Sequence, residues 1–293
     1  MASTALPGTT TVTKTQHNLR QRLPALASRT GVYLLLTIGA IIAAFPFVWM
    51  ILTSLKTYQE TALKVWLPAS PQWSNYPTAW QQAPFARYFL NTTLVAVCTV
   101  GGILFTSVLA AYAFARMDFF GKRFLFVLFL ATLMIPFEIL LIPDYLIITR
   151  LKWANTYMAL TIPWMASAFQ IFLLRQFFAT IPKDLYDAAI LDGAGHLSFL
   201  RLIVIPLSRP ALITVTLFAF LGAWKALLWP LIVTRGEAMR TIEVGMASYV
   251  SEAGTQTQLM MAAAVFTITP IVILYFLGQK QFIQGIATSG LKG

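Results

Sequence analysis

The residues of this chain that could do chemistry gather in one polar stretch, LYDAAILDGAGHLSFLRLIVIPLSRP, from Leu185 to Pro210. Acids, a histidine and arginines lie here between long apolar runs. The run from Pro182 to Leu191 predicts a short helix, with acids in its early turns where the positive end of the helix dipole favours them. Gly193 and Gly195, on either side of Ala194, predict the end of that helix, and Leu197 to Ile205 predicts a second one.

An acid beside small side chains suits the docking of another protein. Methyl groups let a partner approach closely, while a carboxylate accepts hydrogen bonds from a cation. The residues that we assign to this docking surface are Asp187, Ala188, Ala189, Asp192, Gly193 and Ala194. An amphipathic helix resting on a membrane surface has a similar pattern, so spacing alone leaves both interpretations open.

The elements that hold this stretch are predicted to lie in a membrane. The mean hydropathy is +0.73 and only 11% of the residues are charged, far below the roughly 25% of soluble domains. Continuous apolar runs long enough to cross a bilayer indicate an all-α, polytopic protein rather than a β-barrel. The six predicted spans are Val32–Leu52, Tyr88–Phe114, Phe124–Ile142, Tyr157–Leu174, Ala211–Val233 and Leu259–Gln279.

The distribution of Lys and Arg predicts the orientation of these spans. Most of the basic residues outside the spans lie on the side that holds the N-terminal segment, the 181–209 loop and the C-terminal segment. The positive-inside rule therefore places both termini and the polar loop in the cytoplasm. The net charge of +11 is then explained by topology and anionic lipid, and nucleic acid is not an expected partner.

The chain divides into a cytoplasmic N-terminal tail (1–31), a six-helix transmembrane domain (32–279) and a cytoplasmic C-terminal tail (280–293). We expect the N-terminal tail to be mostly disordered, with at most a short interfacial helix at Leu23–Ala27. The Pro- and Trp-rich outer loop from Thr53 to Arg87 suits an interfacial cap, or a docking surface for an external partner. Cys98 is the only cysteine, so no intrachain disulfide can form.

Two formal charges lie inside the predicted spans, at Glu138 and Lys225. If the helices are straight, both lie at a similar depth, and intramembrane charges face the bundle interior or a water-filled path. Glu138, Trp224 and Lys225 are therefore our candidate residues for a solute path. Glu138 and Lys225 could pair beside that path, pair elsewhere in the bundle, or have separate partners.

Other classes of protein are disfavoured by missing motifs. No metalloprotease or nucleophile-elbow motif and no intramembrane cluster of acids supports an enzyme, and His17 and His196 read as isolated, solvated residues. No metal site or bound cofactor is expected. A secondary carrier that relays protons through Glu138 is the remaining alternative.

Four separated motifs resemble the permease subunits of binding-protein-dependent ABC importers, of the maltose and glycerol-3-phosphate type. YDAAILDGAGHLSFLRLIVIPLSRPAL is similar to the family's Glu-Ala-Ala loop, although Asp187 stands in place of the usual Glu. AAYAFARMDFFGKR, MIPFEILLIP and QGIATSGLKG are similar to the second-to-third span junction, the third span and the C-terminal tail. Lys225 departs from the family pattern, which usually has Asn after the first Trp.

The resemblance implies a type I importer permease in a bacterial inner membrane, forming half of a pore for a sugar or polyol. Its implied partners are a second homologous permease, two cytoplasmic ATPases and an external solute-binding protein. The chain has no P-loop, so ATP would be used by the ATPases, which would dock on the 185–206 loop. The residues implied to reach the ATPase from the tail are Gly285, Gly290 and Lys292.

Overall fold

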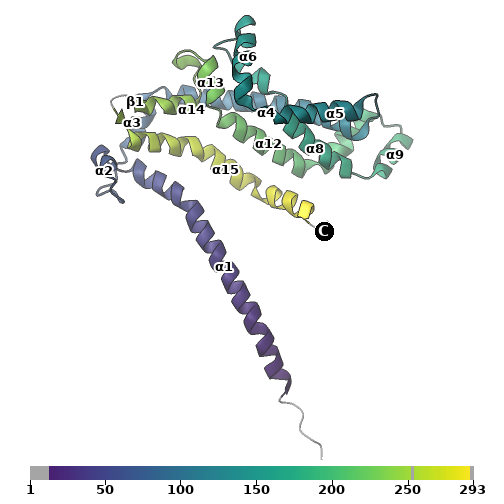
Figure 1. The fold of residues 1–293 in the computed structure, drawn as a ribbon, viewed down its shortest axis with the longest axis horizontal. Coiled ribbons are helices and arrows are strands. Elements are labelled where there is room, and N and C mark those ends of the chain that lie inside the picture. Colours follow the sequence, from purple (N-terminus) through teal and green to yellow (C-terminus); the bar gives the residue numbers. More distant parts are fainter. Residues whose placement is uncertain (1–12, 252–253, 291–293) are drawn as a thin grey trace, which may run out of the picture.

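The computed structural model describes residues 13–251 and 254–290, and this part of the chain is almost entirely helical (Figure 1). The longer helices are α1 (Thr13–Ser54), α4 (Phe85–Arg116), α5 (Lys122–Ala131), α6 (Phe137–Arg150), α8 (Ala168–Thr180), α12 (Arg209–Trp224) and α15 (Thr257–Gly290). The shorter α-helices are α2 (Tyr58–Ala62), α3 (Asn75–Gln82), α7 (Tyr157–Thr161), α9 (Lys183–Leu191), α10 (His196–Phe199), α11 (Ile205–Leu207), α13 (Leu228–Val233) and α14 (Ile242–Met246).

Single turns and one hairpin complete the structure. The 3₁₀ turns are η1 (Thr132–Met134), η2 (Ile162–Trp164), η4 (Glu237–Met239) and η5 (Ala247–Tyr249), and η3 (Leu200–Val204) is a π-helical segment. β1 (Val250–Ser251) and β2 (Gly254–Thr255) form a two-residue antiparallel ladder. The predicted all-α class is confirmed.

Between four and six apolar segments of the described chain can cross a bilayer. Four are single segments: Gly31–Ser54, Phe85–Arg116, Tyr157–Thr180, which is interrupted at 165–167, and Thr257–Gln279. Two more are helix pairs, bent by 100° between Lys122–Met134 and Phe137–Arg150 and by 81° between His196–Leu207 and Arg209–Trp224. Counting each bent pair as one span gives six.

Proline explains why the third and fifth predicted spans are not straight. Pro136 forces its neighbour Ile135 into an extended conformation, with φ −86° and ψ 115°, and the helix ends there. In a continuous helix the ring of Pro230 would clash with the carbonyl of Ala226. α12 accordingly ends at Trp224 and α13 starts at Leu228, so the predicted span Ala211–Val233 is interrupted at 225–227.

The two predicted tails contain more helix than expected. α1 begins at Thr13, so the expectation of a mostly disordered segment was wrong for 13–30. α15 continues to Gly290, so the predicted C-terminal tail is helical from residue 280 to Gly290, and this helix includes Gly285. Lys292 lies outside the described residues.

α4 is the central helix of the bundle, packing along α8 and α12, while α15 packs along α12 and α1 (Figure 1). A buried cluster joins α4, α8 and α12 to the polar loop, and includes Phe178, Phe199 and Val215. α1 diverges from this body, and its apolar residues 31–48 are exposed (Figure 1).

The crossing of α4 and the η2–α8 segment depends on Gly102. A Cβ atom at this position would lie 2.6 Å from Met165 Cβ and closer still to Met165 Cγ. Thr106 Oγ1 donates a hydrogen bond to Met165 O at 2.6 Å, which fixes the same contact one turn further along. A small residue is therefore required where α4 meets the broken segment.

We expect Gly102→Ala to destabilise the protein by about 1–3 kcal/mol, because the Met165 backbone must move to admit the methyl group. The neighbouring Gly101→Ala is the matched control: no atom lies within 4 Å of its Cβ, and Ala favours a helix. Thermal unfolding of the purified variants in detergent measures the difference. Equal melting temperatures for the two variants would contradict the assigned close contact.

Candidate functional site: a capped loop and a central cavity

The polar loop folds as predicted into a helix, a glycine turn and a second helix. α9 spans Lys183–Leu191, and its end is closed by hydrogen bonds from Ala194 N to Ala189 O (2.8 Å) and from Gly193 N to Ile190 O (2.9 Å). This is a Schellman motif, with Gly193 in the left-handed conformation at φ +80°. The predicted end of the helix at the glycine turn is confirmed.

The predicted docking residues divide between the surface and the core. Asp187, Ala188, Asp192 and Gly193 are exposed, whereas Ala189 is 6% exposed and belongs to the buried cluster beneath the loop. Ala194 is half-buried against that cluster. Ala189 and Ala194 therefore fix the loop, and Asp187 and Ala188 are available to a partner.

Two exposed leucines extend this surface and were missed from the sequence. Leu191 is 88% exposed and Leu197 is 72% exposed, on either side of the glycine turn. Large apolar side chains exposed together beside an acid are typical of a protein contact. Their positions in an apolar chain gave no signal, because only the fold shows that they point outward.

His196 is exposed, but it is not the isolated, solvated residue that we expected. Its Nδ1 lies 2.9 Å from Tyr112 Oη of α4, and its ring stacks on Tyr186 of α9 with centroids 5.5 Å apart. Tyr186 also packs edge-on against Phe199. His196 therefore joins α9 and the second loop helix to the central helix.

Arg116, one turn beyond Tyr112 on α4, holds the other end of the loop. Its guanidinium donates hydrogen bonds to the backbone oxygens of Phe178 (2.7 Å) and Ile181, at the end of α8. Residues four apart share one face of a helix. One face of α4 therefore binds both the entry to the loop and its turn.

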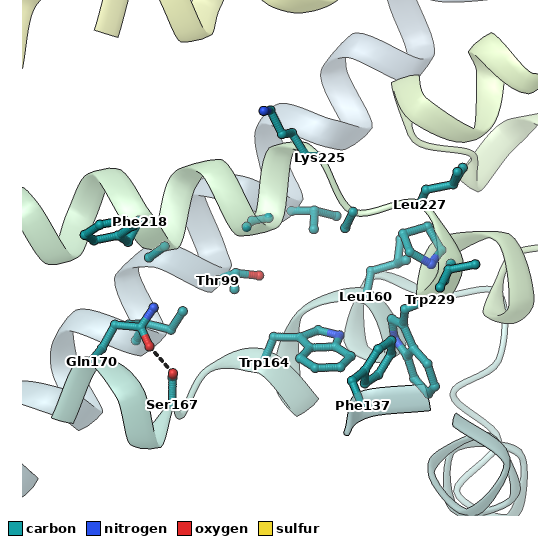
Figure 2. Close-up of a pocket in the computed structure, with 18 of the residues that line it drawn as sticks. Thr99, Phe137, Leu160, Trp164, Ser167, Gln170, Phe218, Lys225, Leu227 and Trp229 are labelled. Carbon is teal, nitrogen blue, oxygen red and sulfur yellow. Dashed lines mark hydrogen bonds between the residues drawn. The ribbon is translucent and has the colours of Figure 1, made fainter. Parts of the chain in front are cut away.

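A cavity of about 590 Å³ lies where the broken helices meet (Figure 2). Its walls come from the middle of α4, the start of α6, the η2–α8 segment, and the break between α12 and α13. The side chains used below are Thr99, Phe137, Trp164, Ser167, Gln170, Lys225 and Trp229. This volume lies within the range of small-molecule pockets.

The cavity combines aromatic walls with a few buried polar groups. Trp164 packs edge-on between Phe137 and Trp229, with centroid distances of 5.1 and 5.8 Å. Thr99 is 3% exposed and its Oγ1 has no hydrogen-bond partner among the described residues. Ser167 Oγ donates to Gln170 Oε1, which orients that amide.

Of the three candidate path residues, only Lys225 lines this cavity. Trp224 is 2% exposed and packs between helices, its Nε1 donating to Thr267 O at 2.9 Å. Glu138 is exposed and is not among the lining residues. Glu138 and Lys225, both within the described chain, form no ion pair. The expectation that they lie at the same depth assumed straight helices, and the helix pair that contains Glu138 is bent by 100°.

Within the described residues, no group of three or more His, Cys, Asp or Glu side chains could hold a metal ion. The site geometry is that of a helical membrane subunit, with a central cavity and an exposed loop fixed to its main helix. Residues 102–288 match the family model described as binding-protein-dependent transport system inner membrane component. The chain belongs to this family.

Relatives give the same assignment. The chain is 34% identical over 268 residues to the arabinooligosaccharides transport system permease protein AraQ of Halalkalibacterium halodurans, covering 88% of this chain and 96% of that one. It is 34% identical to the sn-glycerol-3-phosphate transport system permease protein UgpE of Yersinia pestis, covering 88% and 95%. The protein is thus an inner-membrane ABC importer permease and not an enzyme; a secondary carrier is not supported.

Solved structures share the fold. A chain of a bacterial ABC transporter involved in the import of the acidic polysaccharide alginate matches with a TM-score of 0.73 at 24% identity, covering 92% of this chain and 99% of that one. A chain from a complex of bacterial alginate ABC transporter with a pentasaccharide-bound periplasmic protein matches with a TM-score of 0.63 at 14% identity, covering 88% and 96%. The predicted permease fold is confirmed.

We expect Gly193→Ala to loosen the loop, because a left-handed conformation costs an L-residue about 1–2 kcal/mol. Gly195→Ala is the matched control, since neither glycine has an atom near its Cβ and Gly195 has a φ of −79°. Hydrogen exchange of residues 183–199 measures the effect. Faster exchange in Gly193→Ala alone is expected, and equal exchange in both variants would contradict the strained turn.

Proposed function

We propose that this permease forms half of the translocation pore of an ATP-driven importer and receives its driving force through the 185–206 loop. The observation that carries this proposal is the mounting of the loop on α4. Hydrogen bonds from α4 to His196 after α9 and to Phe178 before α9 fix both sides of the loop to the central helix. A push on α9 would reach the cavity wall on the same helix, where Thr99 lies.

Two cytoplasmic ATPases are the proposed source of that push. The exposed Asp187 would accept hydrogen bonds from a cationic group, and Leu191 and Leu197 would enter an apolar groove. The nucleotide would be bound by the ATPases and not by this chain. Closure of the ATPase pair would switch the bundle between inward-facing and outward-facing states.

A second homologous permease is the proposed partner within the membrane. The apolar residues 31–48 of α1 diverge from the body of the chain, which suits a surface covered by another subunit and by lipid. An external solute-binding protein would deliver the solute, by analogy with the alginate transporter, whose solved complex includes a pentasaccharide-bound periplasmic protein. The names of AraQ and UgpE favour a sugar or polyol as the solute.

Six spans with both termini in the cytoplasm are the proposed topology. Counting α5 and α6 as one bent span and α12 as another, with His196–Leu207 left in the loop, gives six, an even number that returns the chain to its starting side. The loop then faces the ATPases, in agreement with the positive-inside rule.

The segment from Gly285 through Gly290 to Lys292 would also reach the ATPase interface. Its deletion should therefore lower the coupling of ATP hydrolysis to transport more than it lowers membrane insertion.

Asp187→Lys should leave insertion intact and abolish the ATP hydrolysis stimulated by the loaded binding protein, because the docking surface then repels a cation. Asp187→Glu, which has the residue typical of the family, should retain at least half of the stimulation. ATPase assays on the reconstituted importer measure both. Full stimulation in Asp187→Lys would disprove the docking role.

A further inference from the structure

The cavity contains hydrogen-bonding groups that the protein itself leaves unused. Thr99 Oγ1 is buried and makes no hydrogen bond within the described chain. Gln170 is 8% exposed, and its carbonyl oxygen is occupied by Ser167 while its amide nitrogen has no partner among the described residues. Buried polar groups without partners cost about 1–3 kcal/mol each, so they require a ligand or water.

The aromatic wall opposite these groups also contains a hydrogen-bond donor that the described residues do not use. Trp229 donates its Nε1 to Ala159 O at 2.8 Å, which commits that indole to the fold. Trp164 is half-buried at the cavity, and its N–H donates to no described residue. Figure 2 shows its ring facing the space between Thr99 and the α12–α13 break. An amphipathic ring could stack there and donate an oxygen to the indole.

No charged side chain of the described residues points into the part of the cavity between Thr99 and Trp164, where a solute would lie. The cavity is lined by one charged residue among those described, Lys225, and Figure 2 shows its side chain directed away from the space between Thr99 and Trp164. A phosphate or carboxylate placed there would lose its hydration without gaining a cation, which is costly. Hydroxyl groups, in contrast, can donate and accept with Thr99 and accept from the Gln170 amide.

We infer that this subunit itself contains a solute subsite, formed by Thr99, Trp164 and Gln170, that binds an uncharged sugar ring. The inference rests on the proposed function and deepens it by assigning contacts and a solute class to the cavity. Neutral saccharides satisfy all the open groups: their ring face covers Trp164, and their hydroxyls pair with Thr99 and Gln170. Anionic solutes leave their charge unpaired.

The test is uptake by the complete importer, reconstituted in vesicles with its ATPases and binding protein. The probes are neutral di- and trisaccharides of pentoses and hexoses, set against sn-glycerol 3-phosphate and a uronate trisaccharide. The variants Thr99→Val and Gln170→Met keep side-chain size but remove the hydrogen bonds. Thr93→Val is the matched control on α4, because Thr93 is not among the lining residues and donates to Phe89 O.

The expected result is ATP-dependent uptake of a neutral saccharide, with its KM raised about tenfold in Thr99→Val and Gln170→Met and unchanged in Thr93→Val. Gel filtration confirms that each variant assembles. Uptake with an unchanged KM in both site variants overturns the subsite while leaving the proposed function intact. Uptake of the anions alone overturns the solute class, and no ATP-dependent uptake of any probe overturns the proposed function and the subsite together.

Discussion

The structure depends on one constraint: a backbone in the bilayer must satisfy its own hydrogen bonds, except where protein or water covers it. Three apolar segments contain irregular backbone of this kind, at Pro136, after η2, and between α12 and α13. All three breaks contribute side chains to one cavity. Irregular backbone is tolerated only at a site shielded from lipid, so the helix breaks occur together at the cavity, where protein covers them.

The same central helix serves the cavity and the cytoplasmic loop. Thr99 lies on the wall, Gly102 admits the crossing segment, and Tyr112 and Arg116 fix the loop. Because α4 is continuous from Phe85 to Arg116, displacement of the loop moves the wall without an intervening hinge. This arrangement would link the proposed solute site mechanically to the proposed energy-coupling loop, which is far from it in the sequence.

The sequence was sufficient for local features and insufficient for packing. Hydropathy located the apolar segments, and the pattern from Pro182 to Leu191 predicted a helix that ends at the glycines after it, because such rules act within a few residues. The partnership of His196 with Tyr112 and the convergence of Thr99 with Gln170 join residues 84 and 71 positions apart, which no local pattern reveals. The prolines are visible in the sequence, but no local pattern gives the 100° bend between Lys122–Met134 and Phe137–Arg150.

Lys225 was correctly identified as an unusual charge in an apolar span, but its electrostatic neighbour is not the expected Glu138. It lies at the C-cap of α12, where the last carbonyls of the broken helix present the negative end of the dipole, a favourable place for a cation. Its electrostatic neighbour is Glu243 of the outer α14 rather than Glu138: burial raises the pKa of the Glu243 carboxyl, and the charge of Lys225 opposes that rise. A lysine inside an apolar span is thus stabilised by the helix break itself. Lys225 thus lies at the cavity beside the open carbonyls of α12, and the other described residues that line the cavity carry no formal charge.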